Sequence, residues 1–208
     1  RVLFRSATGD SITDGTASTV DSNGRWPDVL ARRLLAQPGA RIAVVNAGIA
    51  ANRVLSDAAG DGGVSILARL DRDALLQTGA THMIFMLGIN DIGQARQNPS
   101  PSAAELIAGH RQVIERAHAL GIKIFGATLT PFEGAAYFTR EGEAKRAALN
   151  QWIRTSKEYD GVIDFDAVMR DPAQPTKFKA NLQSGDWLHP NNAGYETMAG
   201  AIDLAMFR

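Results

Sequence analysis

A serine near one end of this chain and a histidine near the other could together perform nucleophilic catalysis. The segment GDSITDG (residues 9–15) follows a short apolar stretch, and its glycines allow a sharp turn that would expose the hydroxyl of Ser11. A hydroxyl is a weak nucleophile at neutral pH and needs an adjacent base. The same residue types also form plain turns, so this segment alone does not establish catalysis.

The segment DWLHP (186–190) could supply that base. Histidine changes its protonation state near neutral pH, and a carboxylate on its other nitrogen can hold the ring in one tautomer. Asp186 precedes His189 by three residues, so its carboxylate can fold back onto the ring within a loop. Pro190 disfavours a helical conformation at His189 and is typical of the first turn of a helix. The alternative is a surface histidine in an ordinary turn that leads into a helix.

Two further segments carry polar groups where strands are expected to end. GIND (88–91) follows an apolar stretch typical of a buried strand, and the amide of Asn90 could stabilise a developing oxyanion. NAGI (46–49) follows another apolar stretch, and Gly48 would let a backbone N–H approach an oxyanion closely. Either segment could also be a simple turn, with Asn90 and Asp91 capping backbone groups.

In this order and at this spacing, the four blocks resemble those of the SGNH (GDSL) hydrolase superfamily. They run from residue 9 to residue 190, so the resemblance covers nearly the whole chain. The segment TLTPFEGAAYFT (128–139), followed by GEAKRAALNQWIR (142–154), is similar to a bacterial branch described as SGNH esterases or as lysophospholipase L1-like proteins.

The resemblance implies that Ser11 is the nucleophile, His189 the base and Asp186 the group that orients the base. It also implies an oxyanion hole formed by the N–H groups of Ser11 and Gly48 and by the amide of Asn90. The expected reaction is hydrolysis of a carboxylic ester through an acyl-enzyme, without a metal or an organic cofactor. Short-acyl or acetyl esters of small molecules or carbohydrates are the expected substrates.

Other activities remain open at the level of the sequence. Acyl transfer to a sugar or alcohol would use the same acyl-enzyme, and lysophospholipase or thioesterase activity would fit the same scaffold. An inactive module that binds carbohydrate or lipid is the alternative that involves no catalysis.

Predicted strands and amphipathic helices alternate along the chain, which indicates an α/β fold with a parallel sheet between helices. We expect a three-layer α/β/α arrangement with a central, mostly parallel five-stranded sheet, and the resemblance implies the flavodoxin-like version. The predicted strands cover residues 2–8, 42–46, 82–87, 122–128 and 161–164. The predicted helices cover residues 25–37, 64–77, 102–119, 142–157 and 191–206. Ligands bind beyond the carboxyl ends of strands in such sheets, which is where the polar blocks fall.

Aromatic side chains could line an acyl or leaving-group pocket. Two long irregular stretches, 129–141 and 170–185, are of the size that often shapes a binding site. The candidate substrate contacts are Asp10, Phe132, Tyr137, Phe138 and Trp187. Trp187 is the best of these because it lies between the two proposed catalytic residues. Each of the four aromatic side chains could equally cover the edge of the core.

Several other polar features are interpreted as structural. GDGG (60–63) lacks the Lys-Ser/Thr of a phosphate-binding loop and is expected to be a turn. His110 and His118 are eight residues apart on a predicted helix, too far to share a metal, and His82 is expected to be structural or exposed. Solvated or loop-tethering pairs are expected for Arg53, Asp57 and Arg69.

Composition bounds the class of protein. The 208 residues are most simply one domain, residues 1–208, with a substantial core. Lys plus Arg equals Asp plus Glu at 22 each, which argues against non-specific binding to nucleic acid. The absence of cysteine excludes disulfides and thiolate catalysis. No apolar run approaches the ~18 residues that a membrane span requires.

The beginning of the chain departs from the family pattern. Residues 1–6 resemble vector- or library-derived sequence and lack an initiating Met, so we give them no weight in the fold prediction and expect the native N-terminus to be missing. Their Val-Leu-Phe could still complete the first strand by chance. Analogy with the family favours a secreted or periplasmic protein. The oligomeric state cannot be read from the sequence.

Overall fold

The computed structural model of the chain describes residues 3–39, 42–58, 60–94 and 100–207. One sheet is formed by five strands, which are β1 (Leu3–Gly9), β2 (Ile42–Asn46), β3 (Ala80–Met86), β4 (Lys123–Ala127) and β5 (Gly161–Ile163). Every neighbouring pair is parallel. The five predicted strands and the parallel sheet are therefore confirmed.

The strand order β2-β1-β3-β4-β5 creates a site at one end of the sheet. The chain fills one side of β1 with β2 and the other side with β3, so the strand order reverses there. Gly9 pairs with Met86 across β1 and β3, which brings the loops that follow these strands to the same edge. Crevices at such reversal points, beyond the carboxyl ends of the strands, are where open α/β sheets bind ligands.

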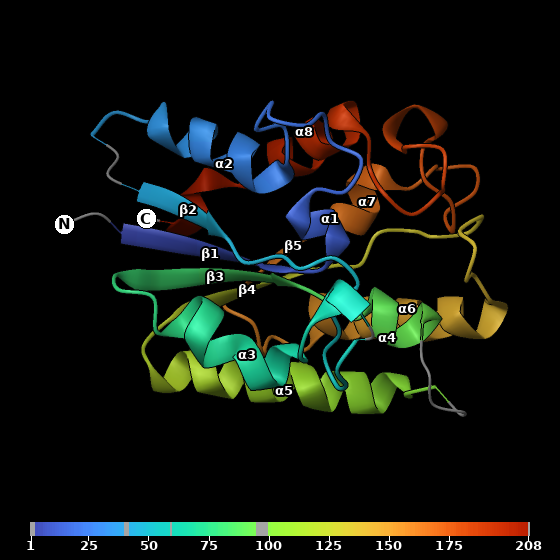
Figure 1. The fold of residues 1–208 in the computed structure, drawn as a ribbon, viewed down its shortest axis with the longest axis horizontal. Helices are drawn as coiled ribbons and strands as arrows, with labels where there is room; N and C mark the ends of the chain where they lie inside the picture. Colours follow the sequence, from blue (N-terminus) through green and yellow to red (C-terminus); the bar gives the residue numbers. More distant parts are fainter. Residues whose placement is uncertain (1–2, 40–41, 59, 95–99, 208) are drawn as a thin grey trace.

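Helices cover both faces of the sheet and complete the predicted three layers (Figure 1). One face carries α2 (Trp26–Leu35), α7 (Phe165–Met169) and α8 (Asn192–Gly200). The other carries α3 (Ile66–Leu70), α5 (Ala103–Ala119) and α6 (Arg140–Thr155). Two short helices, α1 (Ser11–Asp14) and α4 (Ile89–Gly93), directly follow β1 and β3.

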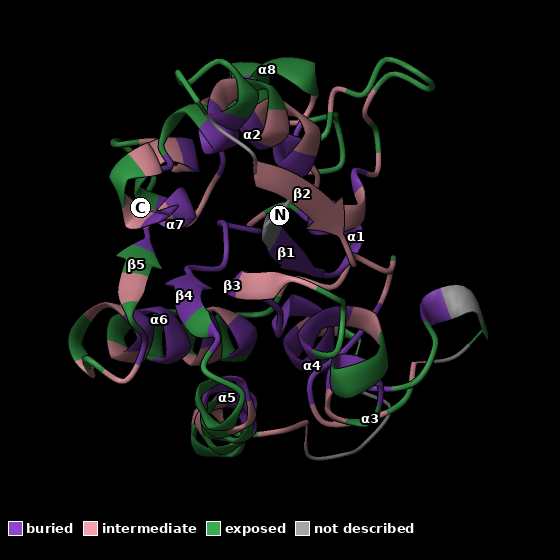
Figure 2. Ribbon diagram, turned by 90° about the vertical axis from the view of Figure 1, so that its left-hand side faces the viewer, coloured by how far each residue is buried: buried purple, intermediate pink, exposed green. Residues whose placement is uncertain are grey.

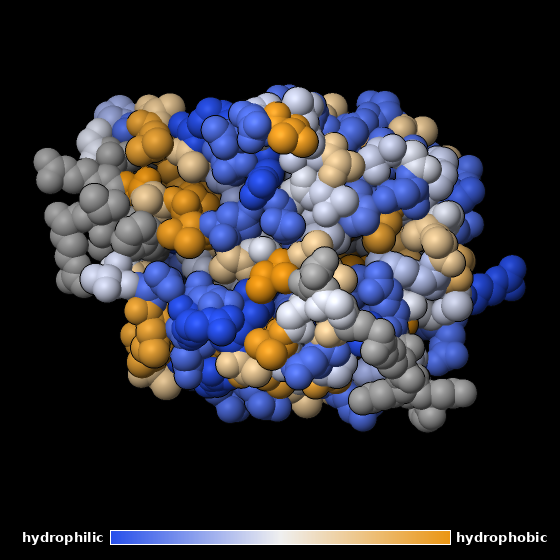
Figure 3. All heavy atoms as spheres, viewed as in Figure 1, coloured by the Kyte–Doolittle hydropathy of each residue, from blue (hydrophilic) through white to orange (hydrophobic). Residues whose placement is uncertain are grey.

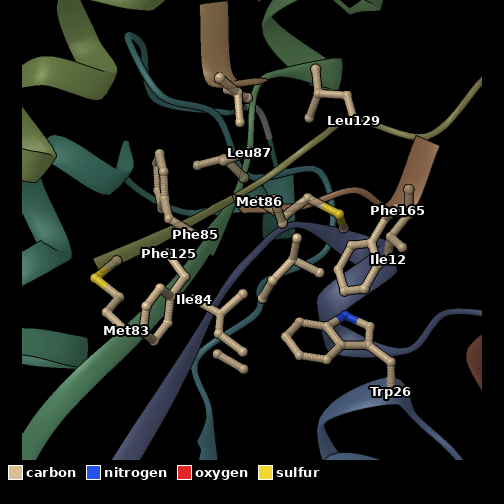
Figure 4. Close-up of a cluster of buried hydrophobic side chains, with 14 of the residues drawn as sticks. Ile12, Trp26, Met83, Ile84, Phe85, Met86, Leu87, Phe125, Leu129 and Phe165 are labelled. Carbon is tan, nitrogen blue, oxygen red and sulfur yellow. The ribbon is translucent and has the colours of Figure 1, made fainter. Parts of the chain in front are cut away.

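The core lies on both sides of the central strands. β1, β3 and β4 are more buried than the edge strands β2 and β5, as Figure 2 shows. Apolar side chains such as Met83, Phe85 and Leu87 are at most 1% exposed. Figure 4 shows part of this core, in which the rings of Trp26 and Phe165 lie 5.5 Å apart and join α2 to α7.

The differences from the predicted helices have local causes. The helix predicted over 64–77 is α3 followed by a π-helical segment, Asp71–Leu75. The last predicted helix ends at Gly200, and the chain turns into a 3-10 helix, Leu204–Phe207, that packs Phe207 against the ring of Phe125. A helix that begins at Ser11 agrees with the turn expected after the first strand. The sequence analysis missed α4 and α7, because helices of five residues have no periodicity to detect.

The first residues of the chain take part in the sheet. β1 begins at Leu3, and the guanidinium of Arg5 donates to the carbonyl oxygen of Phe207 at 2.8 Å. Residues 3–6, although they resemble vector- or library-derived sequence, therefore belong to the folded sheet, within the strand predicted over residues 2–8. Residues 1 and 2 lie outside the described part of the chain.

The surface view in Figure 3 shows apolar side chains scattered among polar ones. A hollow of about 290 Å³ opens beside the start of β2, at the end of the sheet away from Ser11. It is lined by Leu34, Gln37, Pro38, Gly39, Ile42, Leu204 and Phe207. In the ranges that the structure covers, no helix has the length and apolar character needed to cross a bilayer.

A buried histidine links α5 to the loop after β3. The side chain of His110 is fully buried, its Nε2 donates to the carbonyl oxygen of Leu87 at 3.1 Å, and its Nδ1 accepts from the hydroxyl of Tyr159 at 2.7 Å. Burial lowers the pKa of His110 to about 4, although the bond to Leu87 opposes this shift. The ring is therefore neutral in the folded protein at neutral pH.

This histidine should make the fold sensitive to acid. An unfolded histidine takes up a proton below about pH 6.5, whereas the folded one resists protonation until about pH 4, so the free energy of unfolding falls as the pH drops through this window. The loss should reach up to about 3 kcal/mol. Urea unfolding between pH 7 and pH 4 should show a smaller decrease for His110→Gln than for the wild type, because other titrating groups cancel in the comparison.

The matched control is Gln112→Asn, an exposed and non-titrating residue of the same helix, which should keep the pH dependence of the wild type. Equal pH slopes for His110→Gln and the wild type would contradict the prediction.

Candidate active site

Ser11 lies at the first residue of α1, immediately beyond the end of β1. The carboxylate of Asp10 caps this helix by accepting from the N–H of Ile12 at 3.0 Å. A Cβ on Gly9 would lie 2.6 Å from the carbonyl oxygen of Met86, so only glycine allows β1 and β3 to approach this closely before the turn. Ser11 itself is 8% exposed, whereas its neighbours Asp10 and Ile12 are 0% and 2% exposed.

The structure brings the predicted base against the predicted nucleophile. The hydroxyl of Ser11 lies 2.9 Å from Nε2 of His189, although the two residues are 178 positions apart. On the other side of the ring, Nδ1 lies 2.5 Å from Oδ2 of Asp186. Since a carboxylate only accepts, Nδ1 carries the hydrogen and Nε2 is left to accept from Ser11. Serine, histidine and aspartate thus form one continuous hydrogen-bonded row.

The loop before α8 fixes the carboxylate in this row. Oδ1 of Asp186 accepts from the N–H groups of Leu188 and His189 at 2.9 Å each and from the hydroxyl of Ser184 at 3.1 Å. Partial burial raises the pKa of Asp186, but the hydrogen bonds from the backbone and ring of His189 and from Leu188 outweigh it and hold the pKa at about 2. Asp186 is therefore ionised at neutral pH and can stabilise a positive charge on the imidazole.

Asn90 lies in the first turn of α4, beyond the end of β3. Its Nδ2 donates to the backbone carbonyl of Asn52 at 3.2 Å, and its Oδ1 lies 3.4 Å from the hydroxyl of Tyr137. The next residue, Asp91, accepts from the N–H groups of Val54 and Leu55 at 2.8 and 3.0 Å. These bonds orient the amide of Asn90 and use one of its two hydrogens, which leaves the other for an oxyanion.

The N–H of Gly48, which the resemblance places in an oxyanion hole, already has a hydrogen-bond partner within the protein. It donates to Oδ1 of Asn46 at 2.9 Å, and the amide of Asn46 donates to the carbonyl oxygen of Thr13 at 2.8 Å. The glycine is required for a separate reason, because a Cβ there would lie 2.3 Å from the backbone nitrogen of Asp14. The loop after β2 is therefore packed directly against α1.

Comparison with known proteins identifies the family. The model of the GDSL-like lipase/acylhydrolase family matches residues 7–197. The chain belongs to the GDSL-like lipase/acylhydrolase family. No curated protein sequence matches the chain at a significant level. The family is one of hydrolases, and its residue range includes all four blocks that the sequence analysis singled out.

Solved structures share the fold of this GDSL-like hydrolase. An aryl esterase of M. smegmatis superposes with a TM-score of 0.74 at 17% identity, covering 96% of each chain. Est24, a carbohydrate acetylesterase of Sinorhizobium meliloti, gives 0.71 at 16% identity and covers 96% of this chain and 95% of its own. A member of the lipolytic G-D-S-L family from Veillonella parvula gives 0.70 at 19% identity, covering 96% of each chain.

Two buried carboxyl groups lie behind the site of this GDSL-like hydrolase. Burial raises the pKa of Asp10 to about 7, the N–H of Ile12 opposes the shift, and the nearby charge of Asp91 adds to it. Burial likewise raises the pKa of Asp91 to about 6, against the N–H groups of Val54 and Leu55. Oδ2 of Asp10 is buried without a hydrogen-bond partner among the described atoms.

The predicted substrate contacts fall into two groups. Asp10 and Phe132 are both 0% exposed, so neither offers a surface to a substrate in this conformation. Tyr137, Phe138 and Trp187 are half-buried. Tyr137 contacts the amide of Asn90 as described above, whereas Phe138 packs on Phe132 with ring centroids 5.0 Å apart.

Trp187 lies between Asp186 and His189 in the sequence and packs on a distant loop. Its φ of 59° lies in the left-handed region, which is rare for a bulky residue. Its ring packs on Gly134, where a Cβ would meet Cγ of the indole at 2.7 Å. The loop that carries the predicted acid–base pair is thereby packed against the 129–141 stretch.

Burial decides between the alternatives that the sequence left for other polar residues. Arg53 and Arg69 are 4% and 1% exposed, so they are not solvated, although both tether loops. Arg53 donates to the carbonyl oxygen of Gln94, and Asp57 accepts from the N–H of Ser65 at 2.8 Å. His82 is buried against the ring of Phe125, which makes it structural.

The sequence analysis missed Asn52, which is fully buried and accepts from the Asn90 amide through its backbone. No spacing signal distinguishes it from other loop asparagines. Within the described ranges, no three or more histidine, aspartate or glutamate side chains are grouped to hold a metal ion.

Gly48→Ala should disturb the site through the backbone of α1. The added Cβ would meet backbone atoms of Thr13 and Asp14 at 2.8 and 2.3 Å, and backbone cannot move aside as a flexible side chain can. We expect a loss of about 1–3 kcal/mol in the free energy of unfolding. Thermal melting measures it, with Gly200→Ala as the control, because a Cβ there meets no atom within 4 Å. If both variants melt with the wild type, the close packing of this loop on α1 is not required.

Proposed function

We propose that this protein is a serine esterase that hydrolyses carboxylic esters through an acyl-enzyme. The observation that carries the proposal is the hydrogen-bonded row from Asp186 through His189 to the hydroxyl of Ser11. A serine activated by an adjacent base, itself oriented by a third group, is the arrangement required for acyl transfer. Membership of a family of lipases and acylhydrolases supports the same reaction class.

In the proposed mechanism, Nε2 of His189 takes the proton of Ser11 as Oγ attacks the ester carbonyl carbon. The carbonyl double bond opens and leaves the negative charge on its oxygen. The imidazolium, stabilised by ionised Asp186, then gives its proton to the leaving alcohol as the C–O bond breaks. A water molecule repeats the sequence on the acyl-enzyme, which releases the acid and restores Ser11.

We assign stabilisation of the oxyanion to the N–H of Ser11, the remaining amide hydrogen of Asn90 and the N–H of Gly48. The first two are supported by their places at the ends of adjacent strands. The N–H of Gly48 donates to Asn46 in the free protein, so it joins the other two donors only by giving up or sharing that bond. Preorganised donors of this kind are worth most in sites that exclude water.

We infer that the substrates are short-acyl or acetyl esters. Tyr137 and Trp187 are bulky, half-buried side chains fixed by the contacts described above, one beside the oxyanion donors and one beside the acid–base pair. Rigid aromatic walls at both places favour a small acyl group over a long chain. The name of one structural neighbour, a carbohydrate acetylesterase, agrees with this size class.

Ser11→Ala should abolish most ester hydrolysis and all labelling by a fluorophosphonate probe, because both require attack by the serine oxygen. The assay compares initial rates on p-nitrophenyl acetate and probe incorporation per folded molecule. The control is Ser22→Ala, an exposed serine in the loop after α1, which should react like the wild type. Ester hydrolysis by Ser11→Ala at the rate of the wild type would refute the nucleophile assignment.

A series of p-nitrophenyl esters from acetate to palmitate, together with acetylated xylan, tests the substrate class. We expect the ratio kcat/KM to be highest for the shortest acyl groups, because the aromatic walls limit the room for longer chains. The Ser11→Ala protein supplies the background rate. A maximum at long chains would contradict the short-acyl inference while leaving the esterase proposal intact.

A further inference from the structure

Arg69, in α3, is a buried arginine that contacts three loops at the carboxyl edge of the sheet. Its side chain is 1% exposed. Nη2 donates to the carbonyl oxygen of Gly9 at 3.3 Å, and Nη1 donates to that of Ala47 at 2.9 Å. Nε donates to the side chain of Asn52 at 3.1 Å. One guanidinium therefore bridges the ends of β1 and β2 and the loop that follows β2.

Two of these bonds fix peptide groups next to the proposed oxyanion donors. The carbonyl of Ala47 and the N–H of Gly48 belong to one planar peptide and point in opposite directions. Holding that carbonyl therefore sets the direction of the Gly48 N–H. The carbonyl of Gly9 also accepts from the N–H of Ile49 at 3.1 Å, so Arg69 strengthens the junction between the turn that carries Ser11 and the loop after β2.

The third bond leads to Asn90. The amide of Asn52 donates to the carbonyl oxygens of Gly62 and Val64 at 2.7 and 2.8 Å, which leaves its Oδ1 for Arg69. With its side chain held at three points, Asn52 presents its backbone carbonyl to the amide of Asn90 at 3.2 Å. Arg69 thus supports the orientation of Asn90 through one intervening residue.

The burial of this charge is incompletely compensated by opposite charge. The nearest carboxylate, Asp73, is 3.3 Å from Nη1 and 22% exposed. Burial lowers the pKa of Arg69, and Asp73 opposes that shift. A charged side chain in such a position is a poor source of stability, because desolvation offsets much of the attraction. What the guanidinium provides instead is geometry. Its planar set of donors holds three acceptors at fixed angles, which a lysine ammonium cannot do.

We propose that Arg69 is a positioning residue of the oxyanion hole, which sets the directions of the Gly48 N–H and the Asn90 amide by binding Ala47, Gly9 and Asn52. This inference rests on the proposed esterase function of the same site. Arg69 does not touch the substrate in this proposal, so its loss should lower kcat and leave KM nearly unchanged.

The test compares Arg69→Met and Arg69→Lys with a matched variant, Arg5→Met. Arg5 is also a buried arginine, 2% exposed, but its guanidinium donates to Phe207 at the opposite end of β1. All variants are assayed on p-nitrophenyl acetate well below their melting temperatures, with rates expressed per folded molecule.

We expect Arg69→Met to lower kcat by about 10²-fold, the scale that misplacing reacting groups costs. Arg69→Lys should recover part of that loss, because an ammonium can reach one of the carbonyls. Arg5→Met should lower the melting temperature and keep the kcat of the wild type. A kcat for Arg69→Met within twofold of the wild type, or an equal loss in Arg5→Met, overturns the proposal.

A double-mutant comparison separates positioning from general destabilisation. Asn90→Ala alone should cost about 10²- to 10³-fold in kcat. If Arg69 acts partly through Asn90, Arg69→Met should cost clearly less in the Asn90→Ala background than in the wild type. Fully additive losses contradict the Asn52–Asn90 route.

A spectroscopic measurement makes the inference independent of activity. In ¹⁵N–¹H spectra, Arg69→Met should shift the resonances of the Gly48 backbone amide and the Asn90 side-chain amide and should speed their hydrogen exchange, whereas Arg5→Met should leave both unchanged. Unaltered amides in Arg69→Met overturn the positioning role even if the enzyme is active. Wild-type protein that neither hydrolyses esters nor reacts with fluorophosphonate refutes the proposed function instead, and the amide spectra still decide the role of Arg69.

Discussion

The hydrogen bond between Ser11 and Nε2 of His189 is the interaction on which the proposed chemistry depends, and the sheet positions the two loops that form it. One partner follows the first strand, and the other precedes the last long helix. β1 lies in the interior of the sheet, and α8 packs against α2, which covers one face of that sheet. The loop after β1 and the loop before α8 therefore meet at the same edge. Neither loop could hold this geometry alone, since a 2.9 Å contact requires both backbones to be fixed.

The loops at this edge are held in place mostly by hydrogen bonds to backbone groups and by glycines that permit close approach. Gly9 lets β1 touch β3, and Gly48 lets the loop after β2 touch α1. Polar side chains then bind the carbonyl and N–H groups that the strand ends leave without sheet partners. Asp186, Asp91 and Asn46 each accept from backbone N–H groups within their own or a neighbouring loop. Buried polar groups are stabilising only when they are satisfied in this way, so the site and the fold share the same bonds.

Much of this architecture could be predicted from the sequence, and the rest could not for physical reasons. Short apolar stretches that alternate with longer amphipathic ones predicted all five strands, because short apolar runs rich in β-branched and aromatic residues are typical of buried strands. The order and spacing of the polar blocks singled out Ser11 and His189, whose side chains lie 2.9 Å apart in the structure. For Arg69 the sequence left two alternatives, a solvated side chain or a loop tether, because its burial depends on three carbonyl and amide oxygens from distant loops. The present partner of the Gly48 N–H is likewise a tertiary detail that no local pattern encodes.

Trp187 ties two properties of the site together. Its backbone adopts a φ of 59°, which costs on the order of 1 kcal/mol for a side chain with a Cβ, and its indole rests on Gly134. The same residue sits in the turn in which the Asp186 carboxylate accepts from Leu188 and His189. Under the proposed function, a substitution that reshapes this side chain for a larger ester would also disturb the turn that holds the Asp186 carboxylate. Selectivity and turnover would then be coupled at this one position.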